Sequence, residues 1–423
     1  MRSLSNYAKA LRSFTPNARR FLVMTALLGI GTAFQWLFFN LYVLALGYDQ
    51  SFVGLLASIP AWATVLSALP IGLILPRLGY RRGLLAASAL YVTAFVGWAA
   101  FPTAGILLSG SALVGIAAAL LMITTSPLMV AISKPTHRTQ LFGVQFGLNT
   151  LVGVVANLAG GFLPRLFASA FDMGVESPLA YRAVLLVAMA LTACTLIPIA
   201  RMRSMRAGRE DRIVGFREIG EHRRTFLKLL VVQLTVALGA GMLMPFVNVF
   251  YKLRFDLADP AIGTIFSLSS LLTGLSAFLS PILAGRMGKI RMVVATQALS
   301  LPFLVAMGFS PWLELSIVGF LVRTALMNMS APVFSAFTMG IVPSRLRPMT
   351  ATLFALAWNA GWAISSRVSG GIQVAVGFWP LFVITGILYV VSIALTYALF
   401  HRTQELADQG IMEELHVDED ERV

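Results

Sequence analysis

The chain has 423 residues, of which 58% are hydrophobic and 12% are charged, and its mean hydropathy is +0.82. A soluble chain of this length would form two or three domains and carry about twice that share of charged residues. The composition therefore excludes a soluble globular protein, and the high apolar fraction excludes a disordered one. It predicts an integral membrane protein.

Twelve apolar runs are long enough to cross a bilayer, because about 20 helical residues at 1.5 Å each span about 30 Å of hydrocarbon. The runs are continuous, whereas strands of a membrane barrel alternate polar and apolar residues. The first run is longer than the apolar part of a secretory signal, so we expect it to be retained. The predicted spans are 20–46, 52–75, 84–101, 104–131, 140–165, 179–200, 226–251, 260–284, 292–309, 312–341, 349–375 and 379–400.

The basic residues predict the orientation of these spans. With the N-terminus inside, 26 of the 32 Lys and Arg residues lie in or beside cytoplasmic segments, and four lie in outer loops. Lys and Arg stay on the cytoplasmic side of a membrane. We therefore expect a multi-pass protein of the cytoplasmic (inner) membrane with both termini cytoplasmic. The net charge of +14 then reflects topology and contact with membrane lipids, and nucleic acid is not an expected partner.

The longest connection carries eight arginines and divides the spans into six and six. We expect a monomer built of two bundles with polar segments before, between and after them. The predicted parts are a basic cytoplasmic N-terminus (1–19), a first six-helix bundle (20–200), a basic central loop (201–225), a second six-helix bundle (226–400) and an acidic cytoplasmic tail (401–423).

The two halves repeat each other at an offset of about 209 residues. The clearest copies lie in the loops after the second and eighth spans. Glycine gives these turns backbone freedom, and arginine can cap the carbonyl ends of adjoining helices. Paired residues include Arg77 with Arg286, Gly79 with Gly288, Arg82 with Arg291, Asn40 with Asn248, and Asn149 with Asn359.

The first of these loops resembles the signature Gly-x-x-x-Asp-Arg-x-Gly-Arg-Arg of the major facilitator superfamily. The resemblance implies an all-α protein with twelve transmembrane helices in two pseudo-symmetric six-helix bundles. It also implies bundles that rock around a central cavity and loops that take part in gating. Pro76 and Gly285 stand where the signature has its acidic residue. The matching loop residues are Gly72, Arg77, Gly79 and Arg81, with Arg286 and Gly288 in the weaker second copy.

Two arginines lie inside predicted spans, Arg323 in the tenth and Arg367 in the eleventh. Each lies about 12–17 Å below the outer boundary. A charge in hydrocarbon costs roughly 2.5–3.5 kcal/mol on insertion scales, so it marks a functional site by default. Guanidinium fits carboxylate and phosphate, and no carboxylate lies deep in a span. We predict that the pair binds a negative group of a substrate. The alternative is that either arginine ties helices together through backbone carbonyls.

Polar and aromatic side chains recur every four residues in the fifth and eleventh spans, so each series shares one helix face. The tryptophans of the eleventh span could stack on an apolar or aromatic part of a ligand. Packing between helices is the competing role for the amides. The further predicted substrate-binding residues are Gln35, Tyr42, Gln145, Asn149, Asn157, Asn248, Trp358, Asn359 and Trp362.

The spans hold no paired carboxylates, no histidine and no nucleophile–base pair, and a single cysteine excludes a disulfide framework. We therefore expect no enzyme, no cofactor and no metal. The favoured function is a secondary transporter that moves a small anionic or amphiphilic solute by alternating access. The alternatives are a multidrug or lipid-like efflux protein and a transporter-like receptor or scaffold without flux. The efflux alternative rests on methionines 122, 242, 244, 327 and 329.

Overall fold

The structure is a computed structural model that describes residues 14–134, 137–203, 223–343 and 346–408. Every regular element in these ranges is a helix, which confirms the all-α prediction. The predicted N-terminal segment, central loop and acidic tail lie largely outside the described residues.

The helices of the first half are α2 (Pro16–Ala45), α3 (Gln50–Leu78), α4 (Tyr80–Ala100), α5 (Ala104–Ile132), α6 (Arg138–Ala170), α7 (Pro178–Cys194) and α8 (Leu196–Ala200). Those of the second half are α10 (Arg223–Leu243), the 3₁₀ turn η3 (Met244–Phe246), α11 (Val247–Phe255), α12 (Asp259–Met287), α13 (Lys289–Phe309), α14 (Leu313–Ile341), α15 (Arg347–Val376) and α16 (Trp379–Asp408).

Eleven helices of the described chain are long and apolar enough to cross a membrane, with α7–α8 and α10–α11 each counted as one. The remaining predicted span coincides with α15, which at 30 residues is long enough but more polar than the others. It carries Arg367 and buries Ser365, Ser366 and Gln373. Each of the twelve predicted spans therefore coincides with a helix.

Side-chain caps explain where several helices begin. Thr15, Asp49 and Ser177 each accept a hydrogen bond from the backbone N–H three residues later, at 2.9–3.2 Å. Such a cap satisfies a donor that has no partner within the helix. Proline follows Thr15 and Ser177 at the first helical position, where its missing N–H does no harm.

The contacts group the chain into two compact units. The first unit comprises Met1–Arg212 with Phe246–Leu271, and the second comprises Ile213–Pro245 with Leu272–Val423. In this grouping α11 and the first part of α12 belong to the first unit. The bundle limits 20–200 and 226–400 stay predictions from the sequence.

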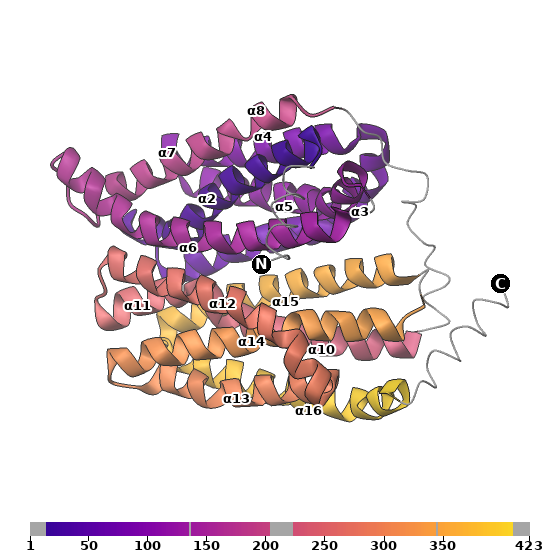
Figure 1. The fold of residues 1–423 in the computed structure, drawn as a ribbon. Coiled ribbons are helices and arrows are strands. Elements are labelled where there is room, and N and C mark those ends of the chain that lie inside the picture. Colours follow the sequence, from indigo (N-terminus) through magenta and orange to yellow (C-terminus); the bar gives the residue numbers. More distant parts are fainter. Residues whose placement is uncertain (1–13, 135–136, 204–222, 344–345, 409–423) are drawn as a thin grey trace, which may run out of the picture. The chain divides into compact units, whose positions relative to one another are not determined.

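Four helix pairings of the first unit recur in the second (Figure 1). In the first unit α2 packs against α6 and α7, and α4 packs against α5 and α7. In the second, α10 packs against α15 and α16, and α13 packs against α14 and α16. These helices correspond through the sequence repeat, so the duplicated sequence forms duplicated packing.

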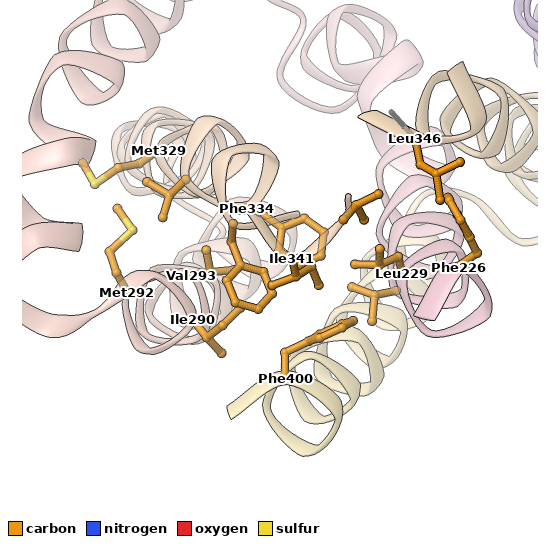
Figure 2. Close-up of a cluster of buried hydrophobic side chains, with 14 residues drawn as sticks. Phe226, Leu229, Ile290, Met292, Val293, Met329, Phe334, Ile341, Leu346 and Phe400 are labelled. Carbon is orange, nitrogen blue, oxygen red and sulfur yellow. The ribbon is translucent and has the colours of Figure 1, made fainter. Parts of the chain in front are cut away.

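Each unit has a buried apolar cluster. The cluster of the second unit joins Phe226, Ile290, Phe334 and Phe400, among others, from α10, α13, α14 and α16 (Figure 2). The cluster of the first unit is related to it by the repeat. Equivalent members are Leu84 and Val293, Leu128 and Phe337, and Ile132 and Ile341, each pair 209 residues apart.

Large apolar side chains also cover the outside of the helices. Leu66, Leu73, Phe162 and Phe278 are each more than half exposed. A water-soluble monomer rarely exposes so much contiguous apolar surface, whereas hydrocarbon solvates it. The exposed residues therefore fit a surface that faces lipid.

Candidate functional site

The two signature loops form the same turn. Gly79 ends α3 and begins α4 with a φ of +81°, and Gly288 joins α12 to α13 with a φ of +85°. A side chain is strained at such an angle, so the repeated glycine follows from the backbone. Arg81 donates from Nη2 to the carbonyl of Ala200, the last residue of α8, at 2.5 Å. Arg77 and Arg286 are exposed in the last turns of α3 and α12.

The second unit contains a cavity of about 440 Å³, a volume typical of small-molecule sites. Its wall is formed by α10, η3, α13, α14, α15 and α16. The polar lining residues are Gln233, Gln297, Arg323, Asn328, Ser330, Ser335, Tyr389 and Thr396. The larger apolar ones are Met244, Met327, Phe334, Phe354, Trp358 and Trp362.

Arg323 of α14 is the cation of this cavity, and it is 2% exposed. Its Nη2 donates to the hydroxyl of Tyr389, and its Nη1 donates to the sulfur of Met244 at 2.9 Å. The guanidinium carbon lies 5.3 Å from the centre of the Tyr389 ring. Nε is buried without an acceptor among the described residues, and no described carboxylate forms an ion pair with Arg323. The guanidinium is therefore not paired with a described carboxylate, and its Nε is a buried donor without a described acceptor.

Glycines on α10 let the neighbouring helices approach this site. A Cβ on Gly239 would lie 2.7 Å from the Tyr389 ring, and one on Gly241 would lie 2.8 Å from the Cα of Trp362. Small residues allow such close packing of membrane helices. Pro245 lacks an N–H, and the 3₁₀ turn at this proline separates α10 from α11. Met244 lies in that turn.

The remaining polar side chains that line the cavity are neutral, and some of them form hydrogen bonds within the protein. Gln297 donates from Nε2 to Ser330 at 3.3 Å, and Asn328 donates to the carbonyl of Thr324 at 2.8 Å. Opposite in character are Trp358 and Trp362 of α15, whose ring centres lie 5.9 Å apart. The cavity thus combines one cation, neutral hydrogen-bonding groups and aromatic faces.

The structure gathers three of the predicted substrate-binding residues in this cavity, namely Arg323, Trp358 and Trp362. Arg367 is exposed and is not part of the cavity lining. Asn359 donates to the carbonyl of Ala355 in its own helix at 2.8 Å.

The other predicted binding residues lie in the first unit. Tyr42 donates to the carbonyl of Trp98 at 2.9 Å, and Asn157 donates to Ser270 at 3.1 Å. Asn248 donates to the carbonyl of Leu37 at 2.9 Å. Partners within the protein thus engage these three side chains. Gln35 and Gln145 are partly buried and Asn149 is exposed, and the cavity lining includes none of the three.

Sequence reasoning missed Tyr389, the residue that receives the charged hydrogen bond from Arg323. A signal was present, because Tyr389 and Arg323 each lie ten residues after the first residue of their helices, α16 and α14. Both helices run in the same predicted direction, so the two side chains share a depth. An aromatic hydroxyl in an apolar span at the depth of a buried arginine is a natural partner for it.

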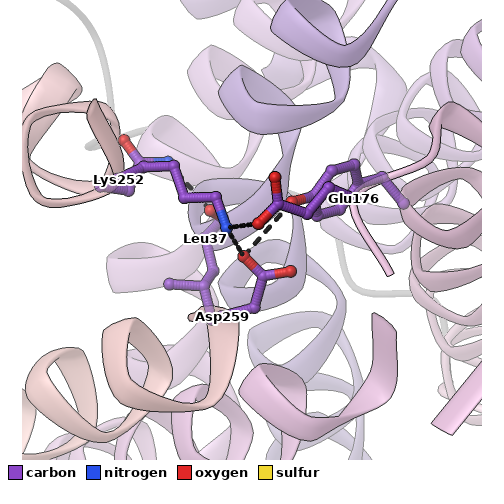
Figure 3. A network of polar contacts seen from close by, with 6 residues as sticks. Leu37, Glu176, Lys252 and Asp259 are labelled. Atoms are coloured by element: carbon purple, nitrogen blue, oxygen red, sulfur yellow. Dashed lines mark hydrogen bonds and ion pairs between the residues drawn. The ribbon is translucent and has the colours of Figure 1, made fainter. Parts of the chain in front are cut away.

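A second polar group lies in the first unit (Figure 3). Lys252 forms ion pairs with Glu176 and, at 3.3 Å, with Asp259. Tyr181 donates to the same Asp259 oxygen at 3.2 Å, while Oδ2 is buried without a partner among the described residues. The Asp259 side chain is fully buried, and that of Glu176 is 62% exposed. Lys252 is therefore attracted strongly to Asp259, which is buried in a low-dielectric setting, and only weakly to Glu176, which is exposed to solvent. No three His, Cys, Asp or Glu side chains of the described chain come together as metal ligands would.

A helical membrane chain with repeated halves, helices broken or closely packed through Pro and Gly, and a polar cavity has the architecture of secondary transporters. The family model of the Major Facilitator Superfamily matches residues 21–227 and 229–415, so the chain belongs to this superfamily of transporters.

Solved structures of transporters share this fold. A bacterial homolog of the human lysosomal transporter Spinster has a TM-score of 0.74 at 16% identity over 90% of this chain and 96% of that chain. The nucleoside transporter NupG has a TM-score of 0.70 at 13% identity, covering 91% and 98%. A D-xylose–proton symporter has a TM-score of 0.70 at 14% identity, covering 90% and 97%. No curated protein matches the sequence.

Proposed function

We propose that the protein is a secondary transporter that carries a small anionic or amphiphilic solute across the cytoplasmic membrane by alternating access. The negative group of the solute binds Arg323 in the cavity of the second unit. One observation carries the proposal: a buried guanidinium faces a 440 Å³ cavity with an unused Nε donor and no described carboxylate beside it. Such a cation is stabilised by an anion that enters and leaves.

The solute class rests on this chain's own residues. The similar structures are named for nucleosides and for xylose with a proton, so the shared fold does not select one solute. Selection comes from the groups that line the cavity. Here these are one arginine, neutral amides and hydroxyls, and aromatic rings.

Among the described residues, the cavity lining includes neither a carboxylate nor a histidine to carry a proton. This favours facilitated diffusion or anion exchange, or a solute that brings its own proton, over exchange of a cation for a proton. The loops at Gly72–Arg81 and Arg286–Gly288 contribute to gating, and both termini face the cytoplasm, as the basic residues favour.

Efflux of an amphiphile is the second candidate, because Met244 and Met327 line the cavity together with aromatic rings. Methionine adapts to ligands of varied shape. A solute without a negative charge would then be carried as well as an anion.

The test is a ligand screen followed by a flux measurement. Purified protein is tested for thermal stabilisation by carboxylates, phosphates, sugars and cationic drugs, and the hits are assayed for uptake into proteoliposomes. Arg323→Gln abolishes stabilisation and uptake of anions, while Arg347→Gln, the same charge change at an exposed site, does not. Binding without flux would support a receptor. Equal responses of Arg323→Gln and the wild type to an anion would contradict the proposal.

A further inference from the structure

We propose that the cavity selects aromatic monocarboxylates, with the carboxylate bound to Arg323 and the ring bound against the tryptophans of α15. This inference rests on the proposed function and names its solute class. It follows from the charge of the cavity, from the donors of Arg323 and Tyr389, and from the aromatic side chains in the lining.

The charge balance favours a single negative charge. Arg323 is the one Lys, Arg or His side chain in the lining, and the other polar lining groups are neutral amides and hydroxyls. A monoanion would neutralise the guanidinium. The second charge of a phosphate or dicarboxylate would be buried without a partner, which is costly in a low-dielectric site.

The donor geometry favours a carboxylate. The Nε–H and one Nη2–H of a guanidinium lie on the same edge and match the two oxygens of a carboxylate. In Arg323 the Nε has no acceptor among the described residues, and Nη2 already points to the hydroxyl of Tyr389. The phenol accepts this bond through its oxygen, so its own proton can be donated to the same carboxylate. The edge of Arg323 and the Tyr389 hydroxyl together supply hydrogen-bond donors that match one carboxylate.

The remaining lining favours a flat π surface. Trp358 and Trp362 of α15 are partly buried, with ring centres 5.9 Å apart and planes inclined by 36°. Phe334 and Phe354, which also line the cavity, stack with ring centres 6.2 Å apart and planes inclined by 18°. An aromatic ligand gains offset or edge-to-face contacts with such rings beyond what apolar burial alone provides. A saturated ring of the same size gains burial only.

The size of the cavity is consistent with this class. A volume of about 440 Å³ lies toward the lower end of small-molecule sites. It suits an acid with one or two rings better than a lipid with two acyl chains.

The experiment compares three ligands that differ in one property each. They are 3-phenylpropanoate, its saturated analogue 3-cyclohexylpropanoate, and its neutral analogue 3-phenylpropanamide. Binding to the full-length wild-type protein is measured by thermal stabilisation and by quenching of tryptophan fluorescence. We expect the phenyl acid to bind about five- to tenfold tighter than the cyclohexyl acid, and tighter still than the amide. This comparison needs no variant to fold.

Two variants assign the contacts. Trp358→Leu reduces the preference for the phenyl over the cyclohexyl acid and retains binding of both, while Trp358→Phe keeps the preference because the π face remains. Trp312→Leu is the control, since Trp312 lies 67% exposed outside the cavity and should leave the preference intact.

The outcomes separate the two proposals. Equal affinity for the phenyl and cyclohexyl acids in the wild type overturns aromatic selection and leaves anion transport standing. Tighter binding of the amide than of either acid overturns the proposed function itself. An unchanged preference in Trp358→Leu overturns the contact between the ligand ring and Trp358.

Discussion

Replacing Arg323 with Gln distinguishes an arginine kept for a ligand from one that ties helices together. In the ligand-free protein the guanidinium is buried without a described carboxylate, at a cost of about 3 kcal/mol. The hydrogen bond to Tyr389 offsets about 2 kcal/mol of this, and the contact with its ring offsets about 1 kcal/mol. The net contribution to stability is therefore close to zero.

We expect Arg323→Gln to change the free energy of unfolding by less than about 1 kcal/mol, because the loss of the contacts with Tyr389 is offset by removal of the desolvation cost of the buried charge. The same substitution removes the stabilisation that organic anions confer on the wild type. An arginine that served as a structural tie would behave differently, since removing the donor leaves buried neutral acceptors without a partner, at a cost of about 1–3 kcal/mol.

The assay is thermal unfolding of the purified variants, with and without anion, followed by intrinsic tryptophan fluorescence. Arg347→Gln provides the matched charge change on an exposed helix start and should respond to anions as the wild type does. A loss of more than about 2 kcal/mol in Arg323→Gln, together with retained stabilisation by anions, would contradict a ligand-binding role for this arginine.

Three further substitutions test the fold. Gly79→Ala places a side chain at a φ of +81° and should lower the free energy of unfolding by about 1–2 kcal/mol, measured by thermal unfolding. Gly115→Ala would bring a Cβ to 2.2 Å from the carbonyl oxygen of Pro60, so the α3–α5 contact must open at a cost of about 1–3 kcal/mol, visible in the same assay. Lys252→Met leaves the buried carboxylate of Asp259 without its cation and should cost about 3–5 kcal/mol in denaturant unfolding.

Matched controls accompany these substitutions. Gly105→Ala adds a Cβ within α5 that meets no heavy atom within 4 Å, so it should be neutral or slightly stabilising. Glu176→Gln removes the exposed partner of Lys252 and should cost less than about 1 kcal/mol. Losses as large as those of Gly79→Ala and Lys252→Met, respectively, would contradict the backbone and burial arguments.

Most of the fold could be predicted because hydrocarbon restricts a spanning chain to helices with apolar exteriors. Continuous apolar runs therefore located the spans, and the helices differ from those runs mainly at their ends. The turn glycines could also be predicted, since Gly79 and Gly288 occupy repeated positions at which the backbone has a positive φ. α15 shows the limit of the apolar signal, because its serines, amides and Arg367 make it the most polar span.

The cavity around Arg323 could be predicted from the sequence only in part. Arg323 was recognisable because a charge in a span is costly wherever the helices pack. Tyr389 shares the depth of Arg323 along its helix, but its contact with Arg323, like that of Met244, depends on the packing at Gly239 and on the turn at Pro245. Conversely, the sequence does not distinguish a polar side chain that binds a ligand from one that donates to a carbonyl of a neighbouring helix, as Tyr42 does.

The transport of an anion bound to Arg323 is tested by uptake of labelled 3-phenylpropanoate into proteoliposomes. The wild type and Arg323→Gln are reconstituted to equal protein density. We expect saturable uptake by the wild type and uptake reduced by more than about tenfold in Arg323→Gln, which corresponds to loss of one charge-assisted contact. Arg347→Gln should transport as the wild type does. Saturable uptake by Arg323→Gln with the rate and affinity of the wild type would contradict the role of Arg323 in binding the anion.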